Sequence, residues 1–145
     1  MHQANPAGEY AHADLFLDWQ GARELVARGV AIGSHTLDHC ILAREDDAHQ
    51  CSCLARSRRL LHDELNVPAE MVAFPSGQRG DYSRRTIEIA QKAGYVYAFT
   101  TWGGLVTGSS NPFEISRIAV STDVSPPDLI ALIFSQLNRK DDSCM

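Results

Sequence analysis

The sequence predicts an α/β fold with a mostly parallel sheet and helices outside it. Segments with apolar residues at helical spacing alternate with single short apolar runs of the kind that form buried strands. Polar residues follow two of these apolar runs directly. Such a sheet is either open or closed into a barrel, and in both forms functional groups collect at the carboxyl ends of the strands.

Length and charge limit the classes of function. The 145 residues fit one domain over residues 1–145, and 44% hydrophobic with 21% charged residues is ordinary globular usage. With 13 basic and 18 acidic residues the net charge is −5, which disfavours nucleic acid or an anionic membrane as partner. No apolar run approaches the roughly 20 residues of a membrane helix. The polar N-terminus carries no secretory signal, so we expect a cytoplasmic protein with residues 1–14 poorly ordered.

The first predicted elements are a helix and a strand. Asp18 is placed to cap a helix over residues 18–28, and Gly29 follows where a C-terminal cap glycine belongs. Residues 30–33 then form a short apolar run that predicts a buried strand. The polar residues 34–40 should therefore lie at the carboxyl end of that strand.

The middle of the chain repeats this alternation. It contains a helix over 48–65, a strand over 71–74 and a turn over 75–77. A helix over 83–93 and an aromatic and β-branched strand over 95–101 come next.

The last third begins with a long glycine-containing loop over 102–112 and a strand over 115–120. Ser125 then caps a final helix with Pro126 at its first position. The face of this helix is strongly apolar, so we expect it to pack on the body of the domain.

Two histidines in the segment after the first strand are the main metal-binding candidates. His35 and His39 are four residues apart, and on a helical turn this spacing places both imidazoles on one side. Neutral imidazole is a good ligand for zinc and similar metals. The spacing alone is also compatible with surface or capping histidines, and the preceding strand and Gly-Ser pair are what favour a metal.

The turn after the second strand is a candidate for binding a reacting oxygen. Pro75 fixes the turn, Gly77 lets a ligand approach the backbone, and the N–H of Ser76 is a candidate oxyanion donor. A plain strand-ending turn is the simpler interpretation of this short pattern.

The four cysteines, Cys40, Cys51, Cys53 and Cys144, form no C-x-x-C pair or disulfide framework, which favours free thiols in a reducing compartment. His49, Cys51 and Cys53 together would chelate a soft metal, but a fourth ligand at sensible spacing is lacking.

Several motifs in order resemble those of polysaccharide deacetylases, the chitooligosaccharide-deacetylase-like enzymes of carbohydrate esterase family four. Residues 19–39 resemble a helix followed by the pattern G-x-x-I-G-S-H-T-x-x-H, and residues 72–77 resemble F-x-Y-P-x-G. Residues 90–95 and 112–118 resemble A-x-x-A-G-Y and P-F-x-L-x-R-I. Order and spacing agree over about residues 17–120, and motifs in series are more specific than any single one.

The resemblance implies a partial deformed (β/α) barrel and a hydrolase that removes N-acetyl or O-acetyl groups from a carbohydrate polymer. It implies a divalent metal, commonly zinc, held by two histidines and one aspartate, with a second aspartate as general base. On this chain the histidine ligands are His35 and His39.

Other roles carry over from the same motifs. Ser76, in the turn set by Pro75, would supply the backbone N–H that stabilises the oxyanion. Thr36 and Asp38 lie within the ligand turn and would orient it.

The first motif of the family is missing from the sequence. The T-F-D-D-G-like strand end, which supplies the base and the third ligand, should precede the histidine pair. Asp14 and Asp18 are the only candidates there, and neither belongs to an Asp-Asp pair. We therefore expect an N-terminally truncated copy, a fragment with a wrongly placed start or a degenerate domain, with low metal affinity and little or no activity of its own.

The departures leave other hypotheses open. A non-catalytic carbohydrate-binding remnant would keep a groove lined by Trp102 and Tyr82, although those aromatics are equally compatible with ordinary packing. A missing strand would also leave an open sheet edge, which favours self-association.

Overall fold

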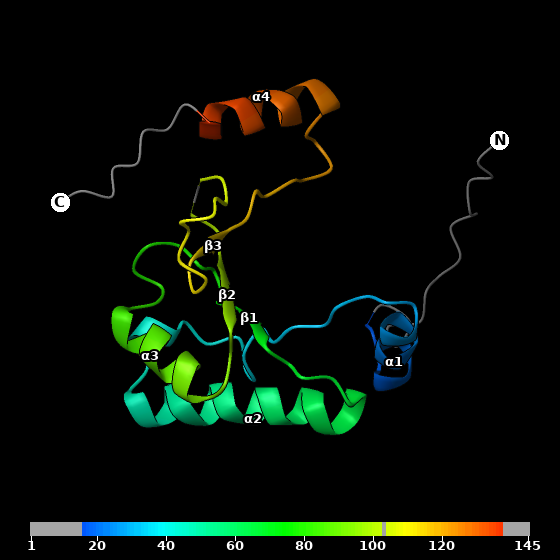
Figure 1. The fold of residues 1–145 in the computed structure, drawn as a ribbon, viewed down its shortest axis with the longest axis vertical. Coiled ribbons are helices and arrows are strands. Elements are labelled where there is room, and N and C mark those ends of the chain that lie inside the picture. The colour runs from blue at the N-terminus through cyan, green and yellow to red at the C-terminus, as the bar shows by residue number, and fades with distance from the viewer. Residues whose placement is uncertain (1–15, 103, 138–145) are drawn as a thin grey trace. The chain divides into compact units, whose positions relative to one another are not determined.

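The computed structural model describes residues 16–102 and 104–137. The described residues fall into two compact units that divide between Ile32 and Gly33 (Figure 1). The expectation of poor order over residues 1–14 lies outside the described part of the chain.

The first unit contains the helix α1 (Trp19–Ala27). The Asp18 carboxylate accepts a hydrogen bond from the N–H of Gly21 at 2.7 Å, which satisfies one of the free donors at the helix start. Gly29 follows the helix with a left-handed φ of 83°. The predicted cap and stop of this helix are both confirmed.

The second unit carries the sheet and the remaining helices. In chain order its elements are η2 (Leu42–Arg44), α2 (Asp47–Leu65), β1 (Met71–Ala73), α3 (Arg84–Lys92), β2 (Tyr97–Thr100), β3 (Ile115–Ser116) and α4 (Pro126–Leu137). The predicted helices are confirmed within a residue or two at each end. In α3 the cap is a reciprocal one, because Ser83 and Thr86 each accept the other's backbone N–H.

The sheet is parallel, with the order β1-β2-β3. Val72 pairs with Ala98 and Phe99 pairs with Ile115. On the other side of β1 a single parallel bridge joins Ser34 to Val72. The fold is therefore the predicted α/β class with parallel strands and outer helices, and within the described residues the sheet is not closed into a barrel.

Two predicted strands are shorter than expected. Residues 30–33 form no strand, and their pairing is reduced to the bridge at Ser34. The predicted strand over 115–120 ends at Ser116. In both cases the apolar run has the composition of a strand, but strand structure persists only where a neighbouring backbone is hydrogen-bonded to it.

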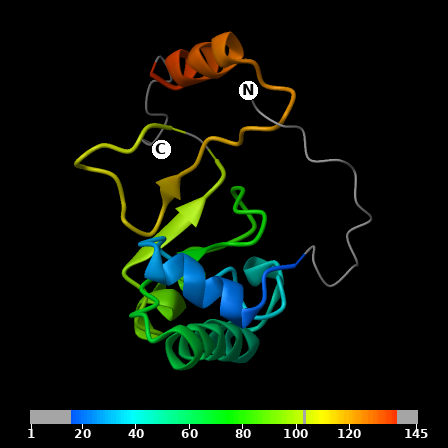
Figure 2. The same ribbon diagram turned by 90° about the vertical axis from the view of Figure 1, so that its right-hand side faces the viewer.

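The core lies between the sheet and two helices. Leu54 of α2 and Ile89 of α3 pack with Val72 of β1 and Ala98 of β2, and all four are essentially inaccessible to solvent. Phe74 completes this core at the end of β1. Figures 1 and 2 show α2 and α3 together on one side of the sheet.

The apolar face of α4 differs from expectation. Ile130 and Phe134 are 56% and 59% exposed, and none of the helix side chains that the structure describes is buried. The prediction that this face packs on the body of the domain is wrong, because no surface within the described residues covers it. Across residues 16–102 and 104–137, no helix has the length and apolar character needed to cross a bilayer.

Candidate functional site

The backbone of Ser34 fixes the position of His35. Ser34 N–H donates to the carbonyl of Met71 and Ser34 C=O accepts from Ala73 N–H, each at 2.8 Å. The adjacent His35 ring then lies beside β1, with Nδ1 at 2.7 Å from the carbonyl oxygen of Ala73. A carbonyl only accepts, so Nδ1 carries the proton. In the neutral form of the ring, Nε2 then has a free lone pair, which is the arrangement of a metal-binding imidazole with an anchored second nitrogen.

A hydrogen-bonded loop brings His39 next to His35. The segment is not the helical turn that the spacing suggested, because Thr36 and His39 have left-handed φ values of 67° and 58°. Ser34 Oγ accepts from Thr36 N–H at 3.1 Å, and Thr36 Oγ1 accepts from His39 N–H at 3.0 Å. The two imidazole centroids are 4.8 Å apart, with the ring planes at 80°. Both rings are exposed, so a cation has access to them.

The turn after β1 has a constrained backbone. Pro75 is buried, and Ser76 and Gly77 have left-handed φ values of 59° and 70°. The Thr101 hydroxyl donates to the Ser76 carbonyl, and Thr101 N–H donates to the Gly77 carbonyl. Within the described residues Ser76 N–H donates no backbone hydrogen bond. The turn thus presents an N–H three residues beyond Ala73, whose carbonyl holds His35.

Trp102 and Tyr82 are in contact, which the predicted carbohydrate-binding groove requires. Trp102 Nε1–H donates to Tyr82 Oη at 2.6 Å, and the Tyr82 hydroxyl donates to Glu114 Oε1 at 3.0 Å. The guanidinium of Arg79 lies 3.6 Å from the centre of the Trp102 ring. These residues line a hollow of about 730 Å³ that also includes Asn111. Burial is the main cause that raises the pKa of Tyr82 to about 12, so this phenol is protonated at neutral pH.

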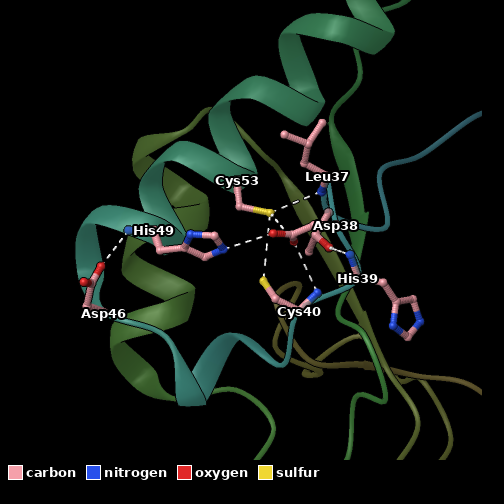
Figure 3. Close-up of polar contacts among 8 residues, drawn as sticks. Leu37, Asp38, His39, Cys40, Asp46, His49 and Cys53 are labelled. Atoms are coloured by element: carbon pink, nitrogen blue, oxygen red, sulfur yellow. Dashed lines mark hydrogen bonds and ion pairs between the residues drawn. The ribbon is translucent and has the colours of Figure 1, made fainter.

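Asp38 does not share a site with the histidine pair (Figure 3). Its carboxylate accepts from Cys53 Sγ–H and lies 3.1 Å from His49 Nε2, whereas the His39 ring points away from it. The hydrogen bond from Cys53, followed by that from Cys40, lowers the pKa of Asp38 to about 2. Asp38 thus holds the loop in place through contacts on one side of it, and the His39 ring faces a different side.

A group of potential metal ligands surrounds this carboxylate. Ligand atoms of Asp38, Cys40, His49 and Cys53 all lie within 4.8 Å of one another. The sequence suggested His49 and Cys53 with Cys51, but Cys51 is exposed and outside the group. Helical spacing could have separated Cys51 from this group. His49 and Cys53 are four residues apart on α2 and share a face, whereas Cys51 points elsewhere.

The histidine pair fits part of a metal centre. Two neighbouring imidazoles, one of them anchored through Nδ1, suit zinc, but a catalytic zinc site uses three protein ligands. Among the described residues, no His, Cys, Asp or Glu completes a group of three with His35 and His39. Asp18 is used as the cap of α1, and Asp14 lies outside the described residues.

Comparisons with known proteins find relatives in sequence and in fold. The chain is 28% identical to the Bacillus subtilis strain 168 protein YxkH, which is named after the polysaccharide deacetylases, over 71% of this chain and 36% of that protein. The solved structure of the Streptococcus pyogenes deacetylase PplD in complex with acetate matches with a TM-score of 0.73 and 25% identity, over 81% of this chain and 50% of that one. The Bacillus cereus polysaccharide deacetylase BC0361 matches with a TM-score of 0.70 and 20% identity, over 81% and 36%.

The fold and these likenesses define a parallel α/β protein of the deacetylase barrel type. A model of the family described as polysaccharide deacetylase matches residues 3–98, well over half of the sequence. The chain belongs to the polysaccharide deacetylase family, whose members are hydrolases of carbohydrate amide or ester bonds and are generally metal-dependent. The chain spans half or less of the length of the relatives reported above.

Proposed function

We propose that this chain serves the hydrolysis of acetyl groups on an acetylated carbohydrate polymer, with zinc as the divalent metal and His35 and His39 as two of its ligands. The observation that carries the proposal is the convergence of the two rings, 4.8 Å apart, beside the end of β1. Family membership supports the reaction class. The Streptococcus deacetylase was solved in complex with acetate, which is the product that such a hydrolysis releases.

The metal, when bound, supplies Lewis-acid polarisation of the acyl carbonyl. The protein's own residues hold the imidazole ligands in position and stabilise the negative charge that develops on the substrate oxygen. The Ala73 carbonyl keeps the His35 proton on Nδ1 and leaves Nε2 available, and Thr36 Oγ1 holds the backbone at His39. The Ser76 N–H, in the turn set by Pro75, would donate to the oxygen that becomes negatively charged. The hollow beside Tyr82 and Trp102 offers aromatic surface for a sugar ring.

The 145-residue chain should have low activity under this proposal. Two imidazoles hold zinc more weakly than three ligands, and no described residue takes the role of the general base beside them. We therefore expect measurable zinc binding that depends on the histidine pair, with acetate release close to background.

Acetate release from acetylated chitooligosaccharides, measured with zinc and with a chelator, tests the activity. Isothermal titration with zinc tests the site when it is done in a Cys40→Ser background, which removes one of the potential ligands around Asp38. The protein with the intact histidine pair is compared with His35→Ala and with His62→Ala as a surface control. Loss of binding in His35→Ala alone supports the proposal. Equal binding in all three proteins would show that the histidine pair is not the zinc site. Rapid zinc-dependent acetate release would show that the chain needs no further ligand or base.

A non-catalytic carbohydrate-binding role is the second candidate. It is favoured by the lack of a third ligand beside the histidine pair among the described residues, together with the intact contact between Trp102 and Tyr82. Binding of chitooligosaccharides that is lost in Trp102→Ala, without any acetate release, would select this role over the catalytic one.

We also infer a reducing compartment such as the cytoplasm. The described cysteines are free thiols, which supports this location. Recovery of the native protein with these cysteines in disulfides would contradict it.

A further inference from the structure

We propose that Asp38, Cys40, His49 and Cys53 form a second metal site that binds zinc in a structural role, separate from the histidine pair. We call these four residues the thiol cluster. The cluster offers two sulfur atoms, one imidazole nitrogen and one carboxylate oxygen, all within 4.8 Å of one another. Four ligands of these types are the set that structural zinc prefers, and paired thiolates favour zinc over calcium or magnesium.

Three of the distances between ligand atoms are close to those of a tetrahedral zinc site. Zinc bonds of roughly 2.0–2.3 Å place the ligands of a tetrahedral site about 3.3–3.8 Å apart. Here Cys40 Sγ lies 4.0 Å from Cys53 Sγ, Cys53 Sγ lies 3.1 Å from Asp38 Oδ1, and His49 Nε2 lies 3.1 Å from Asp38 Oδ2. Binding therefore requires shifts of well under 1 Å along these edges, together with a turn of the carboxylate.

Two separate segments hold the ligands in place (Figure 3). His49 and Cys53 are four residues apart on α2, and the Asp46 carboxylate caps this helix by accepting from His49 N–H at 2.7 Å. Leu37 N–H donates to Cys53 Sγ at 3.2 Å, the kind of second contact that stabilises a thiolate ligand. Ligands on a rigid helix and an ordered loop form a preorganised site.

The charges of the cluster also suit a cation. The Asp38 carboxylate lies among the other ligand atoms: Oδ1 accepts from Cys53 Sγ–H at 3.1 Å, and Oδ2 lies 3.1 Å from His49 Nε2. A divalent cation would displace the thiol protons and neutralise most of the resulting negative charge, as thiolate sites require.

The site would tie the loop that carries His39 to the start of α2. Asp38 and Cys40 flank His39 in sequence, whereas the His39 ring faces away from the cluster. A cation in the thiol cluster would thus fix the loop without competing for the imidazoles at 35 and 39.

Cobalt(II) titration of the reduced protein tests this site, because cobalt bound to thiolates gives an intense sulfur-to-metal charge-transfer band in the near ultraviolet. The histidine pair contains no sulfur and cannot produce that band. We expect a saturable band in the wild type that zinc displaces, and an unchanged band in His35→Ala. Cys40→Ser and His49→Ala should lower cobalt affinity at least about tenfold.

Cys51→Ser is the matched control, since Cys51 lies on the same helix outside the cluster. It should leave the band unchanged. Cys53 is buried, so Cys53→Ser is used only if its circular dichroism matches the wild type; the half-buried Cys40 and the exposed His49 carry the test otherwise.

Three results would overturn the proposal. The first is the absence of a thiolate band in the fully reduced wild type. The second is a band that survives Cys40→Ser but disappears in Cys51→Ser. The third is a Cys40–Cys53 disulfide, seen by mass spectrometry without reductant, in a protein whose reduced form binds no cobalt.

Discussion

Backbone conformation at single residues determines whether the Ser76 N–H is presented. Gly77 has a φ of 70°, and an added Cβ would lie 3.1 Å from both the Phe74 carbonyl oxygen and the Thr101 nitrogen. Both neighbours are backbone atoms, so they have little freedom to move away. The turn therefore requires glycine both for its φ and for the space around it.

We predict that Gly77→Ala lowers the free energy of unfolding by more than Gly80→Ala does. Gly80 also has a positive φ, of 95°, but a Cβ added there would meet no atom within 4 Å. Gly80→Ala should show only the backbone cost of about 1–2 kcal/mol, and Gly77→Ala at least about 1 kcal/mol more. Urea denaturation measures both values, and equal losses would show that the Gly77 contacts do not matter.

Protonation of the single residue Tyr82 makes the free energy of unfolding depend on pH. Its pKa is raised to about 12, chiefly by burial, above the ordinary value of 10. The folded state therefore favours the protonated phenol, and this contribution is complete below about pH 10 and is lost as the pH rises through about 12. The difference in unfolding free energy between the wild type and Tyr82→Phe should be constant from pH 7 to about 10 and then shrink. A difference that already declines between pH 7 and 9 would be inconsistent with the raised pKa.

Buried hydroxyl groups connect α2 to the segment that carries the histidines. Ser57 Oγ on α2 lies 2.7 Å from Ser34 Oγ and 3.0 Å from Tyr95 Oη. Ser34 Oγ in turn accepts from the N–H of Thr36, at the start of the His35–His39 loop. The helix thus supports the loop through hydrogen bonds in addition to apolar packing.

We expect Ser57→Ala to destabilise the protein by about 1–3 kcal/mol, because it leaves two buried hydroxyl groups short of a partner. Ser52→Ala, at an exposed position of the same helix, should have little effect. Thermal denaturation with both variants measures the difference. If Ser57→Ala were as stable as Ser52→Ala, the network would have no structural importance.

Elements also differ in how well the sequence predicts them. The helices carry their own start and stop signals, such as Asp18, Ser83 and Gly29, and these signals act locally. The strands depend on which backbone lies beside them, so residues 30–33 have an apolar composition but form only the bridge at Ser34. Composition does not contain that information.

Within the candidate site, the sequence predicts which residues are involved better than it predicts which residues they contact. It singles out His35, His39, Ser76, Trp102 and Tyr82, and the structure brings the first two together and the last two together. The position of Asp38 could not be predicted, because its neighbours His49 and Cys53 come from a separate helix.

At the scale of the whole molecule, self-association remains a prediction. Ile130 and Phe134 of α4 are exposed, and the described sheet has open edges. We expect the apparent mass in sedimentation velocity to rise with concentration, and the double substitution Ile130→Ser and Phe134→Ser to reduce that rise. Val106→Ser, at an equally exposed loop position, is the control. A mass independent of concentration would contradict this expectation.

The claim on which the account depends is that His35 and His39 bind the same cation, with His35 coordinating through Nε2. Nitrogen-15 NMR of the imidazoles during a zinc titration, in a Cys40→Ser background that disables the thiol cluster, tests it most directly. We predict that the Nε2 signal of His35 and one ring nitrogen of His39 shift together at the same zinc concentration, while the signals of His62 do not move. Independent shifts of the two rings, or a shift at Nδ1 of His35, would contradict the account.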